Sequence, residues 1–87
     1  MRDYYKVQFI KSFKRDLNSI PQDMIPVIIK KSLELEKTPR PIQSKKLRGS
    51  IDRYRLRVGN YRIFYAINDK EKVITIYNVI HRREAYR

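Results

Sequence analysis

The chain has 87 residues, a length that suits one small domain spanning residues 1–87. It contains no cysteine, which excludes a disulfide framework and a thiolate metal site. Its formal net charge is +12, and 13 of the 21 Lys and Arg lie in residues 40–87, so a polyanionic partner such as nucleic acid or an acidic protein is favoured.

The sequence does not predict an association with membranes. The first residues are charged throughout and lack the apolar core of a secretory signal. No apolar run approaches the ~20 residues that span a bilayer, and the basic residues do not gather on one face of an amphipathic helix. We therefore expect a soluble, cytoplasmic protein with no membrane partner.

The first two predicted elements are a strand and a short helix. Tyr5, Val7 and Phe9 alternate with polar residues, which predicts a strand over residues 4–10. Ser12 is a plausible N-cap of the helix that follows, in which apolar residues recur at spacings of four and three.

A second, longer helix is predicted over residues 22–37. If Asp23 is its N-cap, Pro26 lies in the first turn, where its missing N–H costs little. Pro39 and Pro41 end the helix. We expect the two helices to cover the apolar face of the sheet and to carry no chemistry.

Four strands are predicted after the helices. Residues 42–47 predict a short strand, and residues 53–58 and 61–65 predict a hairpin in which Gly59 takes the positive φ of a two-residue turn. The turn sets the register, with cross-strand pairs Val58–Tyr61, Arg57–Arg62, Leu56–Ile63 and Arg55–Phe64.

The last strand is predicted over residues 72–80 and is apolar on both faces, which is typical of a central strand covered on both sides. The order β-α-α-β-β-β-β predicts an α+β fold, with two N-terminal helices packed on one face of a small, mainly antiparallel twisted sheet.

The hairpin gathers basic residues on one face. Arg55, Arg57 and Arg62 converge behind its apolar layer, and Arg53 follows the same alternation. Because like charges placed opposite each other destabilise a sheet, this face indicates an anionic ligand, although a merely solvated basic surface is the alternative. Further candidate contacts to RNA are Lys45, Lys46, Arg48, Arg82 and Arg83, the last two flanked by His81 and Tyr86.

Such a cluster suits RNA phosphodiester chemistry. Attack by a ribose 2′-hydroxyl on its own phosphate places negative charge on the phosphoryl and leaving oxygens, which fixed guanidinium groups stabilise. Arginine stays protonated, so the candidates for moving protons are His81, Tyr86, Lys45 and Lys46. Tyr86 could instead stack on an unpaired base.

The acidic residues do not predict a metal site. Asp52 and Glu84 are isolated from each other, and a single His without Cys cannot form a typical zinc site. We therefore expect neither a metal nor any other cofactor.

The runs KKLRG, YRLRVGNYRIFYAI and KVITIYNVIHRREAY together resemble the RelE-type toxins of the RelE/ParE superfamily, from bacterial and archaeal toxin–antitoxin modules. The resemblance covers residues 5–86. It implies a compact α+β fold, a cytoplasmic location and neutralisation by an antitoxin that wraps the toxin. RelE-type members cleave mRNA in the ribosomal A site, without metal, through attack by a 2′-hydroxyl.

The resemblance also implies roles for single residues. Arg55 and Arg57 fall on two basic positions of the active strand, and Arg62 falls on a phosphate-stabilising arginine. Arg82 matches an arginine proposed to assist protonation of the leaving group, and Tyr86 matches a tyrosine that stacks on or orients the substrate.

Two further positions, Lys46 and Arg48, match basic residues that hold ribosomal or messenger RNA. Some RelE-type enzymes have lysines where this chain has Arg55 and Arg57, and a lysine has been considered as the base. With arginines there, His81 becomes a stronger candidate for the base.

We therefore predict a toxin of a type II toxin–antitoxin module that acts as a ribosome-dependent mRNA endoribonuclease. Its expected partners are an acidic antitoxin, mRNA and the ribosome. One alternative is a toxin of the same superfamily that inhibits DNA gyrase. The other is a non-catalytic basic RNA-binding module whose arginines only hold phosphates.

Overall fold

The structure is a computed structural model that describes residues 4–85. Its elements are β1 (Lys6–Phe9), α1 (Lys11–Asp16), the 3₁₀ turn η1 (Leu17–Ser19), α2 (Ile25–Leu33), the 3₁₀ turn η2 (Glu34–Glu36), β2 (Ser44–Lys46), β3 (Arg53–Val58), β4 (Tyr61–Asn68), β5 (Val73–His81) and α3 (Arg82–Ala85). The predicted order of strands and helices is confirmed, and α3 is an addition that the sequence pattern did not predict.

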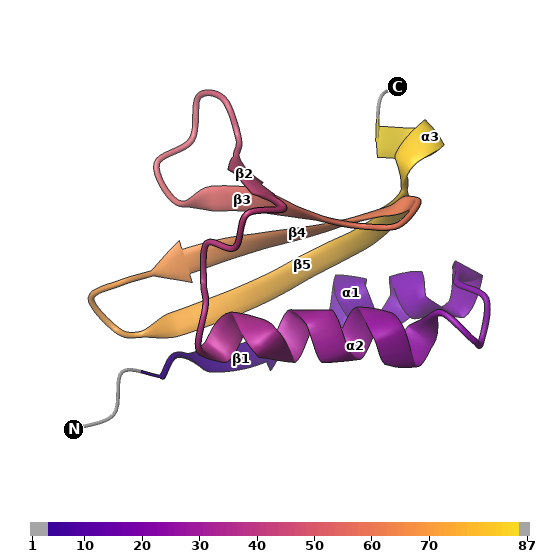
Figure 1. Cartoon of the computed structure of the whole chain (residues 1–87), viewed down its shortest axis with the longest axis horizontal. Helices are drawn as coiled ribbons and strands as arrows, with labels where there is room; N and C mark the ends of the chain where they lie inside the picture. The colour runs from indigo at the N-terminus through magenta and orange to yellow at the C-terminus, as the bar shows by residue number, and fades with distance from the viewer. Residues whose placement is uncertain (1–3, 86–87) are drawn as a thin grey trace.

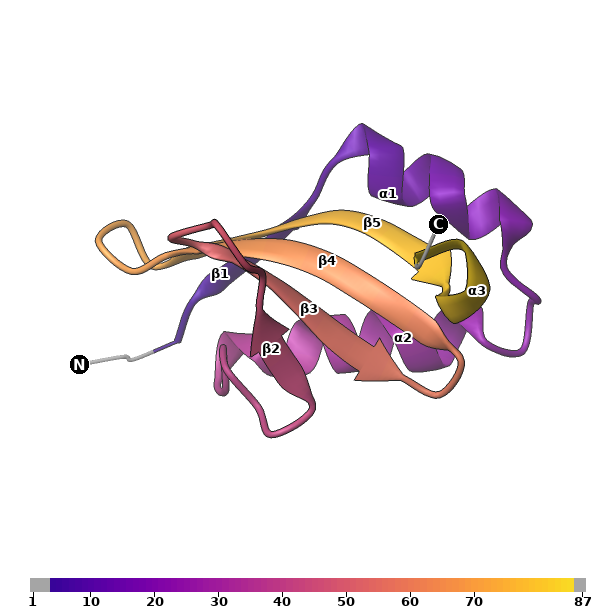
Figure 2. The same cartoon turned by 90° about the horizontal axis from the view of Figure 1, so that it is seen from above.

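The five strands form one twisted sheet in the order β1-β5-β4-β3-β2. Only β1 runs parallel to its neighbour, and the other pairs are antiparallel. Helices α1 and α2 lie on one side of this sheet, while the β2–β3 loop and α3 project on the other (Figures 1 and 2). The predicted α+β architecture is therefore confirmed.

The hydrophobic core lies between the helices and the covered face of the sheet. Its centre is fully or almost fully buried and consists of Phe13, Ile28, Leu35, Ile63, Tyr65, Ile74 and Ile76. The predicted register of the β3–β4 hairpin is confirmed at all four pairs. Gly59 has the expected positive φ, 57°, which a residue with a Cβ adopts only with strain.

The two predicted helix caps are wrong. α1 begins at Lys11 without a side-chain cap, and Ser12 Oγ instead donates a hydrogen bond to the carbonyl oxygen of Tyr77, at 2.6 Å. Asp16 Oδ2 accepts from the backbone N–H of Val79, at 3.1 Å. Because β1 pairs with β5 only as far as Ile76, polar side chains of α1 satisfy the edge of β5 that β1 leaves without a partner.

At α2, the N-cap position belongs to Met24 rather than Asp23, and no side chain caps the helix. Pro26 lies in the first turn, as predicted. The helix ends at Leu33 and continues as the 3₁₀ turn η2, so the predicted range combined two elements.

The expectation that β5 is covered on both sides is also wrong. Its residues on the helix side are buried, whereas Val73, Thr75, Tyr77 and Ile80 remain partly exposed. The sheet therefore has one covered apolar face and one open face, on which polar and basic residues gather.

No helix among residues 4–85 is long and apolar enough to cross a membrane.

Candidate RNA-binding face

The open face of the β3–β4 hairpin carries the predicted arginines. Arg57 is directly opposite Arg62, and Arg55 is directly opposite Phe64. Arg57 is exposed and Arg55 is partly exposed, but only 6% of the surface of Arg62 is accessible. The register therefore places Arg57 and Arg62 on the same face of the hairpin, where Arg57 is exposed and Arg62 is buried.

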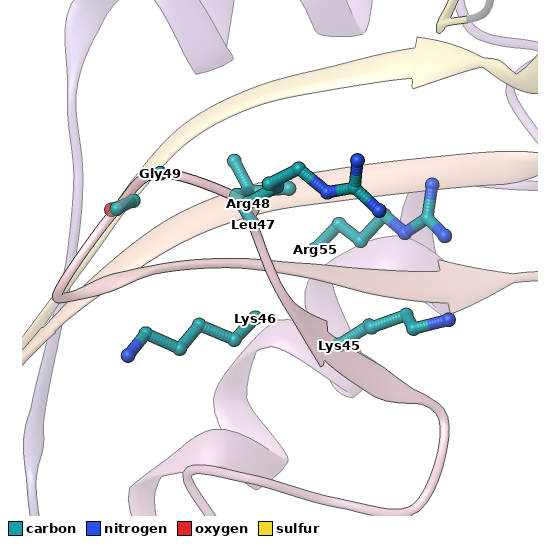
Figure 3. Close-up of a pocket in the computed structure, with 7 residues that line it drawn as sticks. Lys45, Lys46, Leu47, Arg48, Gly49 and Arg55 are labelled. Carbon is teal, nitrogen blue, oxygen red and sulfur yellow. The ribbon is translucent and has the colours of Figure 1, made fainter.

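A hollow of about 600 Å³ extends this face across β2 and the β2–β3 loop. Lys45 is directly opposite Arg55, and both line the hollow with Arg48. Figure 3 shows the charged ends of Lys45, Arg48 and Arg55 pointing toward the same end of the sheet, whereas Lys46 points the other way. The hollow is open and cationic, a shape and charge that fit a phosphate group.

The cations at the hollow and on the exposed part of the hairpin form no salt bridge within the described part of the chain; they are Lys45, Arg48, Arg55 and Arg57. Two salt bridges form among residues 4–85, Lys31–Glu34 and Arg40–Asp69, and neither involves the open face. Concentrated positive charge that is left without counter-charges attracts an anion from solution. The hollow and the exposed part of the hairpin therefore form a continuous cationic surface.

His81 is not brought together with these arginines. It is directly opposite Tyr61, which packs against the core, and the two rings meet edge to face with centroids 5.2 Å apart. Its Nδ1 accepts a hydrogen bond from the backbone N–H of Arg83, at 3.2 Å. The imidazole thus lies on the helix side of the sheet, away from the face that carries Arg57 and Arg62.

Two further predicted residues, Arg82 and Arg83, directly follow β5. Arg82 and Arg83 are exposed in the first turn of α3, and the backbone N–H of Arg82 donates to the carbonyl oxygen of Asn60, at 2.7 Å. This bond ties α3 to the turn that joins β3 to β4. Tyr86 lies outside the described residues.

Comparisons with known proteins identify the family. The family described as "ParE toxin of type II toxin-antitoxin system, parDE" matches residues 7–86. Toxin RelE3 of Methanocaldococcus jannaschii is 34% identical, over 93% of this chain and 94% of that protein. The fold matches a chain of the archaeal RelE–RelB complex from Pyrococcus horikoshii with a TM-score of 0.80, at 33% identity and over 91% of this chain and 96% of that chain.

A second solved structure agrees. A chain of the toxin–antitoxin complex RelBE2 from Mycobacterium tuberculosis also gives a TM-score of 0.80, at 28% identity, over 91% of this chain and 99% of that chain. This chain is a RelE-type toxin of the RelE/ParE superfamily.

Sequence reasoning missed two features of the toxin's open face. The first is Tyr77, whose ring lies 4.3 Å from the guanidinium carbon of Arg53. Tyr77 is the unpaired residue of a β-bulge, because Phe64 pairs with Asn78 while Tyr65 pairs with Ile76. The second is α3, for which a run of only four helical residues gives no periodic signal.

The toxin also has a cluster in which an arginine is paired. Arg40 donates to both carboxylate oxygens of Asp69, at 2.8 and 3.4 Å, and its Nε donates to the hydroxyl of Tyr54, at 2.9 Å. The hydroxyl of Tyr5 donates to the same carboxylate. The bond from Arg40, followed by that from Tyr5, lowers the pKa of Asp69, and the carboxylate in turn raises the pKa of Arg40.

Among residues 4–85, no group of three or more His, Asp and Glu side chains could hold a metal ion. The donors on the open face are guanidinium and ammonium groups, which repel cations. The chemistry available there is the binding of anions and the stabilisation of negative charge.

Proposed function

We propose that this RelE-type toxin is a ribosome-dependent endoribonuclease, which cleaves mRNA by attack of a ribose 2′-hydroxyl on the adjacent phosphodiester. The observation that supports it most directly is the open sheet face, where Arg55, Arg57 and Lys45 gather without acidic partners among the described residues and Arg62 lies directly opposite Arg57. The similarity to proteins named RelE is a second support.

In this proposal Arg62 stabilises the charge that develops on the phosphoryl oxygens. Arg62 is buried in the position directly opposite Arg57, and its Nη1 donates to the carbonyl oxygen of Tyr61, at 3.4 Å. A charge fixed in a poorly hydrated site acts more strongly than one in water and needs no reorganisation during the reaction. Arg57 and Arg55 are more exposed and bind the phosphates of the RNA.

Proton transfer needs a group on the same face. Of the candidates, Lys45 shares the face of Arg55, whereas the ring of His81 packs against Tyr61 on the helix side. We therefore propose that Lys45, rather than His81, transfers the proton. Arg82 and Tyr86 keep the roles that the resemblance implies: Arg82 assists protonation of the leaving group, and Tyr86 stacks on or orients the substrate.

The proposed reaction requires no metal ion. Chelation with EDTA should leave cleavage intact when ribosomal magnesium is kept constant by buffering. The products should carry a 2′,3′-cyclic phosphate and a 5′-hydroxyl. A 3′-hydroxyl end would instead indicate attack by water on the other side of the phosphorus and would contradict the proposal.

We also propose a small, net acidic antitoxin encoded beside the toxin. The net charge of +12 favours such a partner, and two of the similar structures are RelB–RelE complexes. Copurification from the native operon tests this, and association should slow as salt rises. A toxin that is recovered alone and is harmless to its host would contradict it.

A second candidate is inhibition of DNA gyrase, because the matching family is described as the ParE toxin of parDE. One experiment separates the two functions. Expression is induced briefly, the 5′ ends of cellular mRNA are mapped and the topology of a reporter plasmid is measured in the same cells. New mRNA ends within translated regions support the ribonuclease, whereas relaxed plasmid without new ends supports gyrase inhibition.

A further inference from the structure

The open face carries a second cluster, beyond the arginines of the hairpin. Arg53 lies on β3 and Tyr77 on β5, so the two are separated by the whole width of β4. The residue of β4 directly opposite Arg53 is Ala66, whose small side chain lets Arg53 reach over the strand. The guanidinium carbon then lies 4.3 Å from the centre of the Tyr77 ring.

The β-bulge accounts for the position of Tyr77. A bulge inserts one extra residue, re-aims side chains and bends its strand. Here Tyr77 is the extra residue between the pairs Phe64–Asn78 and Tyr65–Ile76. Tyr77 and Phe64 both remain partly exposed on the open face, whereas Tyr65 on the covered face is buried.

The arrangement has the features of a stacking surface. Unpaired bases stack on aromatic rings and on the planes of arginine guanidinium groups. A guanidinium that already lies against a ring has lost part of its rotamer freedom, so less entropy is lost when a base binds to it. Acidic side chains also bind to basic surfaces, but a carboxylate does not stack on an aromatic ring.

We propose that Arg53 and Tyr77 form a platform on which one unpaired base of the bound RNA stacks, at a distance from the phosphate that is cleaved. The inference rests on the proposed function, because it names a further contact to the same substrate. Arg53 and Arg57 are four residues apart on β3, about 13 Å at ~3.3 Å per residue. Stacked nucleotides follow one another every ~3.4 Å, so the platform would hold a base roughly four nucleotides from the cleavage site.

Such a contact makes no bond with the reacting atoms. It should tighten binding and favour bases that stack well, and it should leave the rate of the chemical step unchanged once the substrate is saturating. Phe64 lies beside Arg55 on the face between the platform and Arg62, so it would guide the intervening nucleotides.

The test uses a short single-stranded DNA that contains one 2-aminopurine, a base whose fluorescence is quenched when it stacks. DNA lacks the 2′-hydroxyl and cannot be cut by the proposed mechanism, so binding is measured separately from cleavage. Wild-type toxin should quench the probe. Both Tyr77→Ala and Arg53→Ala should weaken binding by about five- to 150-fold, the range for loss of one stacked base, whereas Tyr77→Phe should bind like the wild type.

The matched control is Arg15→Ala, which removes the same charge from an exposed position on α1. It should change the Kd by much less than Arg53→Ala and leave the quenching intact. Equal losses in the two arginine variants would overturn the platform, because Arg53 would then act only through its charge. Absence of quenching by the wild type, or a poly-glutamate peptide that binds with the same sensitivity to Tyr77→Ala, would overturn it too.

A second readout is cleavage on programmed ribosomes. In Tyr77→Ala the toxin concentration for half-maximal rate should rise while the saturating rate is kept, and a fall of the saturating rate alone would contradict the platform. If wild-type toxin does not cut on ribosomes, the proposed function fails, and the quenching experiment still decides whether the platform binds a base.

Discussion

Two regions of the toxin use arginine in opposite ways. Arg40 bridges the segment after η2 to the β4–β5 turn, where it pairs with the carboxylate of Asp69, and to β3, where it bonds to the hydroxyl of Tyr54. Arg57 and Arg62 are directly opposite each other in the hairpin, and no salt bridge between described residues involves Arg57 or its neighbour Arg55. One region satisfies its charge within the fold, and the other accumulates charge on the open face.

The difference indicates what each arginine is for. A paired surface arginine contributes modestly to stability and is screened by salt. Arginines placed opposite one another oppose folding, and in the proposed function the RNA phosphates would neutralise them. We therefore expect substitutions in the two regions to have opposite signatures, loss of activity on the open face and loss of stability around Arg40.

The largest expected effect is that of Arg62→Ala. A donor that is directed at developing charge is worth roughly 2.7–4 kcal/mol, so single-turnover cleavage should slow by about a hundred- to a thousandfold. The removal of repulsion from Arg57 should partly offset the lost packing of the buried stem, so we expect a stability change within ~1 kcal/mol. Thermal unfolding measured in parallel checks this, and a variant that melts far lower but still cuts would contradict the assignment.

A smaller loss is expected for Arg57→Ala and Arg55→Ala, which would each remove one contact to phosphate. Hydrogen bonds to charged groups are worth about 1.5–3 kcal/mol, which corresponds to a loss of about ten- to 150-fold in affinity for programmed ribosomes. The slope of log affinity against log salt should fall by about one for each arginine removed. An unchanged salt slope would indicate that the side chain does not contact RNA.

In the core, Tyr65→Phe should lower stability without affecting cleavage. The Tyr65 hydroxyl donates to the carbonyl oxygen of Pro39, at 2.8 Å, and burial raises its pKa to about 12. Loss of this bond should cost about 1 kcal/mol, or ~4–8 °C in Tm for a domain of this size. Tyr5→Phe removes an exposed hydrogen bond and should cost less, so an equal loss in both variants would contradict the role of burial.

The smallest expected effect is that of Asp69→Asn, which breaks the ion pair with Arg40. Because the folded-state pKa of Asp69 is lowered, the pair stabilises the toxin above the unfolded pKa of ~3.9. The contribution is lost as the pH falls through the folded-state pKa. The Tm of the variant should therefore lie slightly below that of the wild type at neutral pH and approach it in acid. A difference that persists unchanged at pH 2 would require another cause.

The sequence was sufficient for the order of the elements, for the hairpin register and for the face on which the hairpin arginines lie. The two-residue turn at Gly59 sets the hairpin register, and the register alone places Arg57 opposite Arg62. The alternation of apolar residues then assigns one face to the core. These features depend on local spacing, which a single sequence displays.

Features that depend on neighbours distant in the sequence were not predictable. The burial of Arg62 depends on the tertiary arrangement around β4, and the side of the sheet on which His81 lies depends on its pairing with Tyr61. Ser12 resembled a helix-capping residue, but its hydroxyl instead bonds to the edge of β5 that the short β1 leaves without a partner, as does the carboxylate of Asp16. The contact of Tyr77 with Arg53 requires a β-bulge, and no turn residue in the sequence indicates that bulge.

The most direct test compares two arginines on programmed ribosomes. Single-turnover cleavage of mRNA is measured for the wild type, Arg62→Ala and Arg40→Ala, at a temperature where all three are folded. We expect Arg62→Ala to be at least about a hundredfold slower and Arg40→Ala to cut at nearly the wild-type rate. A wild-type rate in Arg62→Ala, or an equal loss in both variants, would contradict the division between an arginine face for RNA and a paired arginine for the fold.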